Sequence, residues 1–306
     1  MKYLLFISLI FAVACRGDKH STDSQIVSVP QTQPTPSPTP EQEYPKQLDD
    51  IFVDDDSLSY NGYDVIRRKK KVNYKYPDET GKTISNLIEV SFAVVQRKNR
   101  TLAKFEGVYF GAGNATDFGL FPLLGEREAK QLIVSQTIPR GGRHWVASLS
   151  PNFHVLFDSG DYEVGREDFS VMDIDKDGIY EILLPVTAFY WLQDKMYMAE
   201  IPLPVIIFKY DSQAKKYFPA ISLIQDYFLK GIESDITKLN QSEERNYLSR
   251  RLNIFLRYIY AEKESEAWAF FDREYRLPDK EEIKSRIRTI LKDERVYKYI
   301  YRKRAT

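Results

Sequence analysis

The chain has 306 residues, with 44 basic and 44 acidic side chains and therefore no formal net charge. A balanced charge gives no electrostatic reason to expect a nucleic acid or another polyanion as a partner. Hydrophobic residues make up 43% of the sequence, which is enough for a buried core, and the length suits one or two domains. We therefore expect a globular protein that binds no nucleic acid.

The first residues, MKYLLFISLIFAVAC, have the properties of a targeting segment. Lys2 supplies a positive charge, and Tyr3 to Val13 form an apolar run that is too short to span a bilayer as a helix. Cys15 closes this run and is the only cysteine of the chain, so no intramolecular disulfide can form. We expect residues 1–14 to be a signal peptide.

The AVAC sequence that ends at Cys15 resembles the lipobox of bacterial lipoproteins, with Ala12 where that family more often has leucine. The resemblance implies cleavage before Cys15, which would then carry the lipid and anchor the chain to a membrane of the bacterial cell envelope. Arg16 stands where an aspartate holds some lipoproteins in the inner membrane, so the outer membrane or cell surface is favoured. The alternative is an ordinary signal peptide with a chance cysteine.

Residues 15–47 are expected to form a tether between the lipid and the folded part. Serine, threonine, proline and glutamine dominate this segment, and such a composition buries too little apolar surface to order the chain. The run PTPSPTP favours an extended polyproline II conformation. A spacer of this kind lifts a folded domain off a membrane surface.

Residues 48–220 are predicted to form a β-rich domain. Runs rich in β-branched and aromatic residues alternate with turn sequences such as PDETGK and RKNR, which indicates antiparallel strands joined by short connections. We expect either part of a propeller or a sandwich. The predicted strands are Tyr63–Tyr76, Ile84–Gln96, Thr101–Phe110, Lys130–Thr137, His144–Leu149, His154–Asp158, Glu181–Trp191, Met196–Ile201 and Val205–Tyr210.

Residues 221–306 are predicted to be helical, which makes the fold class α+β. Apolar residues recur there at intervals of three and four, as in an amphipathic helix. Asp279 with Glu282 three residues later resembles a capping box at a helix start. The predicted buried positions are Leu248, Leu252, Phe255, Leu256, Ile259, Tyr260, Ala267, Phe270, Phe271, Tyr275, Ile283, Ile287, Ile290 and Leu291.

The stretch DIDKDGIYE places three aspartates at alternate positions between two apolar runs. Calcium and other hard cations take six to eight oxygen ligands, roughly, and carboxylates on a tightly turned loop can converge on one ion. Gly178 tolerates the left-handed backbone that such a turn requires. An EF-hand is excluded because its twelfth position would be Leu184 instead of glutamate and because both flanks are typical of strands.

The same stretch resembles the calcium loop of FG-GAP or VCBS-type repeats, in which DxDxDGxxE or DxDxDGxxD connects two strands. The resemblance implies calcium as the ligand of this chain. The implied calcium ligands are Asp173, Asp175, Asp177, the carbonyl of Ile179, and Glu181. The motif occurs once, whereas a propeller has several blades. The alternative is a turn that keeps the shape of the motif and binds no calcium.

No catalytic motif is present, since the chain lacks GxSxG, HExxH and a cysteine nucleophile, and we expect no enzymatic activity. The favoured function is a lipid-anchored, calcium-stabilised envelope protein that binds a protein or glycan partner. One alternative is an envelope hydrolase acting on a carbohydrate or peptide, for which Glu163, Glu167 and Asp168 are nearby carboxylates without a diagnostic spacing. Another is a structural subunit that docks through its helical tail.

Overall fold

The structure is a computed structural model that describes residues 46–47, 51–77, 81–107, 114–125, 127–138, 141–165, 169–239 and 246–302. The elements below all belong to one compact unit, Glu43–Thr306. The predicted signal peptide, the predicted lipidation site Cys15 and the predicted tether up to residue 45 lie outside the described residues.

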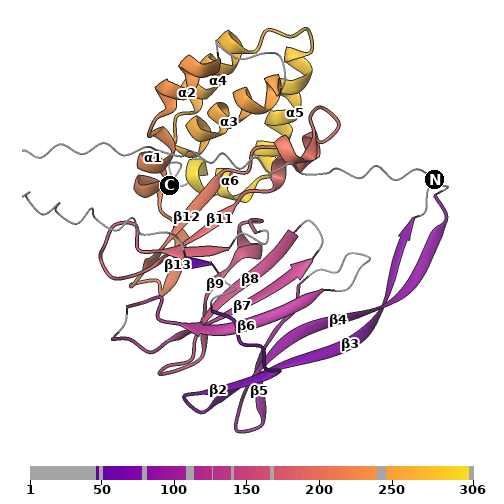
Figure 1. The fold of residues 1–306 in the computed structure, drawn as a ribbon, viewed down its shortest axis with the longest axis vertical. Helices are drawn as coiled ribbons and strands as arrows, with labels where there is room; N and C mark the ends of the chain where they lie inside the picture. The colour runs from indigo at the N-terminus through magenta and orange to yellow at the C-terminus, as the bar shows by residue number, and fades with distance from the viewer. Residues whose placement is uncertain are drawn as a thin grey trace, which may run out of the picture. The chain divides into compact units, whose positions relative to one another are not determined.

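The described strands form three antiparallel sheets, one of five strands and two of four (Figure 1). Each four-stranded sheet is a meander, because its strands are neighbours in the order of the sequence. The first sheet contains β2 (Ser57–Tyr60), β3 (Tyr63–Pro77), β4 (Thr83–Arg97) and β5 (Arg100–Phe105). The second contains β6 (Ala115–Phe121), β7 (Gln131–Ile138), β8 (Gly141–Ser148) and β9 (His154–Asp158).

The third sheet has the order β1-β10-β11-β12-β13 and differs from the others by its first strand. β1 comes from the start of the folded unit and pairs with β10, so residues far apart in the sequence share this sheet. The members are β1 (Lys46–Gln47), β10 (Ser170–Met172), β11 (Glu181–Pro185), β12 (Val205–Asp211) and β13 (Lys216–Pro219).

The second sheet is buried on both faces, because successive side chains of a strand point to opposite sides. In β7, Ile133 belongs to one hydrophobic cluster, whereas its neighbours Leu132 and Val134 belong to another. The cluster of Ile133 reaches the third sheet, where the rings of Phe157 and Phe208 lie 4.9 Å apart. The other cluster reaches the first sheet. The sheets therefore stack face to face, and consecutive four-stranded meanders have the connectivity of propeller blades.

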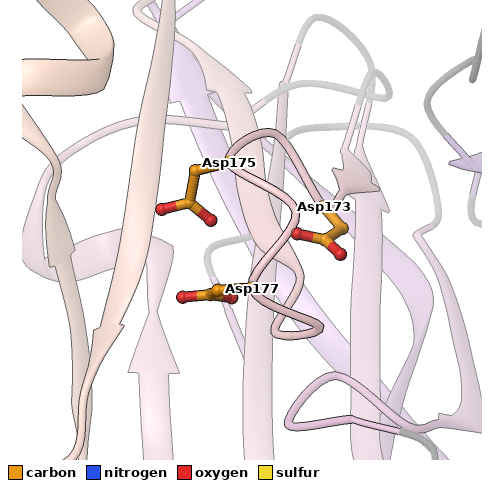
Figure 2. A group of neighbouring side chains, drawn as sticks. All are labelled: Asp173, Asp175 and Asp177. Atoms are coloured by element: carbon orange, nitrogen blue, oxygen red, sulfur yellow. The ribbon is translucent and has the colours of Figure 1, made fainter.

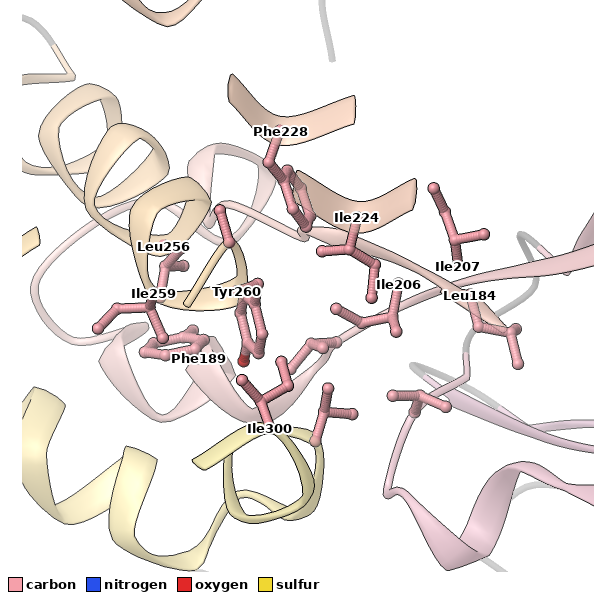
Figure 3. Close-up of a cluster of buried hydrophobic side chains, with 14 of the residues drawn as sticks. Leu184, Phe189, Ile206, Ile207, Ile224, Phe228, Leu256, Ile259, Tyr260 and Ile300 are labelled. Atoms are coloured by element: carbon pink, nitrogen blue, oxygen red, sulfur yellow. The ribbon is translucent and has the colours of Figure 1, made fainter. Parts of the chain in front are cut away.

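Six helices follow the strands among the described residues, and their hydrophobic core is continuous with that of the third sheet. Figure 3 shows the shared core, in which Ile206 of the sheet lies near Ile224 and Tyr260 of the helices. All three side chains are fully buried. The helices are α1 (Ile221–Leu229), α2 (Ile232–Leu239), α3 (Tyr247–Tyr260), α4 (Glu264–Glu274), α5 (Lys280–Asp293) and α6 (Arg295–Arg302).

The predicted fold class is confirmed: the chain is α+β, with an antiparallel β-rich part followed by a helical segment. The first helix begins at Ile221, where the sequence places the change from strands to helices. One hydrophobic cluster runs across this point without a break. Strands and helices therefore depend on one another for the burial of their apolar faces.

The segment between β11 and β12 does not form the two strands predicted for it. β11 ends at Pro185, and two 3₁₀ helices follow, η3 (Ala188–Leu192) and η4 (Met198–Glu200). Phe189 and Leu192 are buried three residues apart, which matches the period of a 3₁₀ helix instead of the period of two in a strand. The apolar composition of this segment serves the shared core with the helices.

Two further details differ from the sequence predictions. The folded part begins with β1 at Lys46, inside the range assigned to the tether. Asp279 precedes α5 but makes no capping hydrogen bond, because its carboxylate instead accepts a hydrogen bond of 3.0 Å from the hydroxyl of Tyr275. The predicted buried face of this helix is correct at Ile283 and Ile287.

Candidate metal centre

The acidic loop connects two neighbouring strands of the third sheet, as the sequence predicts. β10 ends at Met172, which is paired with Glu181 at the start of β11. The loop therefore leaves and re-enters the sheet at adjacent positions. Two of its residues have left-handed backbone, Lys176 with φ of 61° and Gly178 with φ of 85°. The glycine thus lies where the turn needs it.

The loop brings Asp173, Asp175 and Asp177 together (Figure 2). One carboxylate oxygen from each lies within 4.8 Å of the others. Backbone N–H groups hold two of these side chains: Gly178 donates to Asp173 at 3.1 Å, and Ile179 donates to Asp177 at 2.8 Å. Three carboxylates gathered in this way can hold a metal ion.

Glu181 lies beside this cluster and is fully buried. Its Oε2 accepts a hydrogen bond of 2.8 Å from the backbone N–H of Ile174. Its Oε1, like Oδ1 of Asp173, is buried and has no hydrogen-bond partner among the described residues. Burial, reinforced by the negative charge of Asp175, raises the pKa of Glu181. A buried carboxylate oxygen without a donor is costly and calls for a partner.

Lys209 of β12 also reaches the loop, and the sequence analysis missed it. Its ammonium donates hydrogen bonds to Asp175 and, at 2.7 Å, to Asp177, and it lies 3.6 Å from Oε1 of Glu181. Partial burial opposes the charge of Lys209, but the hydrogen bonds from it to the two aspartates raise its pKa. The hydrogen bond from Lys209 is also the main reason why the pKa of Asp177 is lowered.

The fold thus brings part of the predicted ligand set together. Asp173, Asp175 and Asp177 are brought together. A buried oxygen of Glu181, which accepts no hydrogen bond among the described residues, lies 3.6 Å from the ammonium that bridges Asp175 and Asp177. Ile179 holds its predicted place in the loop and is half-buried. Carboxylate and carbonyl oxygens are the donors that calcium prefers, so these residues fit such an ion.

The carboxylates that the sequence suggests for a hydrolase do not form a cluster like that of the acidic loop among the described residues. Glu167 and Asp168 lie outside the described residues, and Glu163 forms an ion pair of 2.9 Å with Arg295. Glu163 and Glu294 both line a cavity of about 610 Å³, whose other lining residues come mainly from η3 and α5. Burial raises the pKa of Glu294 to about 7, a value that suits a general acid.

The surroundings of Glu294 favour a structural role instead. It directly precedes α6, and its two oxygens accept hydrogen bonds from the backbone N–H groups of Val296 and Tyr297. The hydroxyl of Tyr260 adds a longer contact of 3.4 Å. This carboxylate therefore caps a helix, and the interactions that hold it leave neither oxygen directed at a substrate.

Among the described residues, no helix has both the length and the apolar character needed to cross a membrane. The sequence matches no known protein family. Comparison with curated proteins gives no match, and no solved structure matches the fold.

Proposed function

We propose that this chain is a lipid-anchored protein of the bacterial cell envelope, at the outer membrane or cell surface, whose calcium-stabilised β part serves a binding or structural role without catalysis. The observation that carries the calcium part is that three aspartates converge beside a buried oxygen of Glu181 that accepts no hydrogen bond among the described residues. An ion at this loop would neutralise the carboxylates and coordinate that oxygen.

Calcium is the favoured ion because of the ligand chemistry. All the proposed side-chain donors are carboxylates, with no histidine or cysteine in the loop, and such oxygen donors suit calcium or magnesium far better than zinc. Magnesium demands near-ideal octahedral geometry, whereas calcium accepts the irregular set that a loop supplies. Extracellular calcium modules bind with dissociation constants of about 10⁻⁴ to 10⁻³ M, a range suited to an envelope protein.

The test is thermal unfolding of the protein beginning at Glu43, which retains β1 and the whole compact unit. An ion that binds only the native state stabilises it by about 2.7 kcal/mol at a hundredfold excess over its dissociation constant. We expect calcium to raise the melting temperature and a chelator to reverse the rise. Asp175→Ala and Asp177→Ala should each remove most of it. An unchanged melting temperature with and without chelator would sink the calcium proposal.

The anchoring part rests on the AVAC sequence and needs its own experiment. Cys15→Ser should abolish incorporation of radioactive fatty acid and leave a larger, unprocessed precursor. A serine variant that is still labelled would contradict lipidation at this residue. Fractionation of the wild-type cells would then separate outer-membrane from inner-membrane placement.

A further inference from the structure

Lys209 is positioned by the sheet and not by the loop it contacts. It follows Phe208, which is paired with Ile182 of β11, and it is itself paired with Phe218 of β13. Because β11 and β12 are antiparallel, Lys209, which follows Phe208, lies beside Glu181, which precedes Ile182. This placement fixes the stem of the lysine within reach of the acidic loop, whatever the loop binds.

The ammonium of Lys209 takes the place of a cation in the arrangement described above. It bridges Asp175 and Asp177 and lies 3.6 Å from the oxygen of Glu181 that accepts no hydrogen bond among the described residues. Without a positive charge, three clustered carboxylates would repel one another. The lysine relieves this repulsion, so the loop can keep its shape when no ion is bound.

The same contacts conflict with ion binding. Lys209 donates hydrogen bonds to Oδ2 of Asp175 and to Oδ2 of Asp177, so its ammonium occupies one oxygen of each of two proposed ligands. A divalent cation at the centre of the loop would also repel the ammonium at a few ångströms. Both cations therefore cannot occupy the cluster together.

We propose that Lys209 is a built-in competitor for calcium, which fills the carboxylate cluster in the ion-free protein and is displaced when calcium binds. This inference rests on the proposed function. It implies that the loop exchanges one cation for another instead of folding around the ion. It also implies that calcium binds more weakly than the carboxylates alone would allow, so the site fills only where calcium is abundant.

The first test is the calcium dissociation constant of Lys209→Met, measured by titration calorimetry on the protein beginning at Glu43. We expect binding about tenfold tighter than in the wild type, because the ion no longer displaces a paired ammonium. The ion-free variant should also melt at a lower temperature than the ion-free wild type. Lys209→Gln is a second variant that gives the same reading should the methionine protein fail to fold.

The matched control is Lys216→Met, which removes the same charge from the neighbouring strand β13. Lys216 is exposed, begins β13 and is paired with Asp211, and no ion pair joins it to the acidic loop among the described residues. Its effect on the dissociation constant measures the general loss of positive charge near the loop. Only a tightening in Lys209→Met well beyond that of Lys216→Met supports competition.

A second test follows the wild-type lysine directly. Displacement by calcium should free the ammonium, so acylation of Lys209 by an amine-reactive reagent should proceed faster in calcium than in chelator. Mass spectrometry gives both rates, with Lys216 as the internal reference. Equal rates for Lys209 in the two conditions, in a protein that calorimetry shows to bind calcium, would overturn the inference.

The outcomes separate the two proposals. If the wild type, Lys209→Met and Lys216→Met all bind calcium with the same dissociation constant, the role of Lys209 is overturned and the calcium site stands. Binding by Lys209→Met alone supports competition and shows that the lysine has replaced the ion in the wild type, which overturns calcium stabilisation. Absence of binding in every variant overturns both proposals.

Discussion

Two buried glutamates, Glu181 and Glu294, occupy similar environments and end in different roles. Burial raises the pKa of each, and each is almost completely shielded from solvent. Both carboxylate oxygens of Glu294 accept hydrogen bonds from backbone N–H groups in the first turn of α6. Glu181 uses one oxygen on Ile174 and leaves the other without a hydrogen bond among the described residues.

The difference teaches that a raised pKa does not by itself mark a functional carboxylate. Perturbed groups are frequent at functional sites, but structural groups are perturbed too. The useful distinction is whether the fold satisfies every oxygen. At the end of α5 it does, whereas at the acidic loop one oxygen remains for a ligand.

The largest expected effect comes from removing the region that contains Glu294. A chain ending at Ala220 would expose the side chains of Leu184, Phe189 and Ile206, which are fully buried in the shared core. We expect this chain to lose cooperative thermal unfolding, which circular dichroism would measure. A truncated protein that still unfolds in one sharp transition would show that the strands form an independent domain. Glu181 and Glu294 would then belong to two separate domains.

The next effect is the pH dependence caused by Glu294. Its pKa is about 7 in the folded protein against 4.5 for an ordinary glutamate, so the folded state holds the proton more tightly. The wild type should therefore lose stability as pH rises, by about 3 kcal/mol between pH 4.5 and pH 8 relative to Glu294→Gln. Urea unfolding at several pH values measures this difference. Parallel curves for the two proteins would contradict the raised pKa.

Glu181→Gln sharpens the comparison at the loop. The amide keeps one oxygen for coordination but loses the charge, so calcium should bind about tenfold more weakly, which is about 1.4 kcal/mol. Calcium titration followed by melting temperature measures it. Glu294→Gln should leave calcium binding unchanged. If the two glutamine variants weaken calcium equally, the unpartnered oxygen does not distinguish the glutamates.

The smallest effect is expected for Asp211→Ala, an aspartate in a turn without the calcium motif. Asp211 accepts hydrogen bonds of 2.8 and 2.9 Å from the N–H groups of Gln213 and Ala214. Losing this turn should lower the free energy of unfolding by about 1 kcal/mol. The rise in melting temperature on adding calcium should stay intact. A smaller rise in the melting temperature would show that calcium acts through the negative charge of the protein in general and not through the acidic loop.

The predictable parts of this molecule are those with local signals. Alternating and β-branched runs predict β7 and β9 within a residue or two, and the helical period predicts the buried face of α3. The loop is equally local, since Asp173 to Glu181 are contiguous and their spacing alone indicates a cation. The clustering of the aspartates then follows from one turn at Gly178.

The missed parts depend on contacts between distant residues. Lys209 is 32 residues from Asp177, and only the pairing of β11 with β12 brings it to the loop, although a single charge in the apolar run VIIFKY was a usable signal. Glu294 is one of several acidic residues in its neighbourhood, and only burial against Tyr260 distinguishes it. The sequence predicts a strand up to Trp191 where η3 forms, because the local sequence does not indicate that helices distant in the chain pack against this segment.

The pairing of β1 with β10 also determines where the fold would take up mechanical tension. Any pull from the residues before Lys46 enters at β1, whose two residues are paired with Ser170 and Val171. β10 ends at Met172, and the acidic loop follows it directly. A chain under load would therefore peel β1 away first, and the next element to feel the force would be the strand that precedes Asp173. The acidic loop thus follows the strand that would be loaded next if the chain were pulled from its N-terminal side.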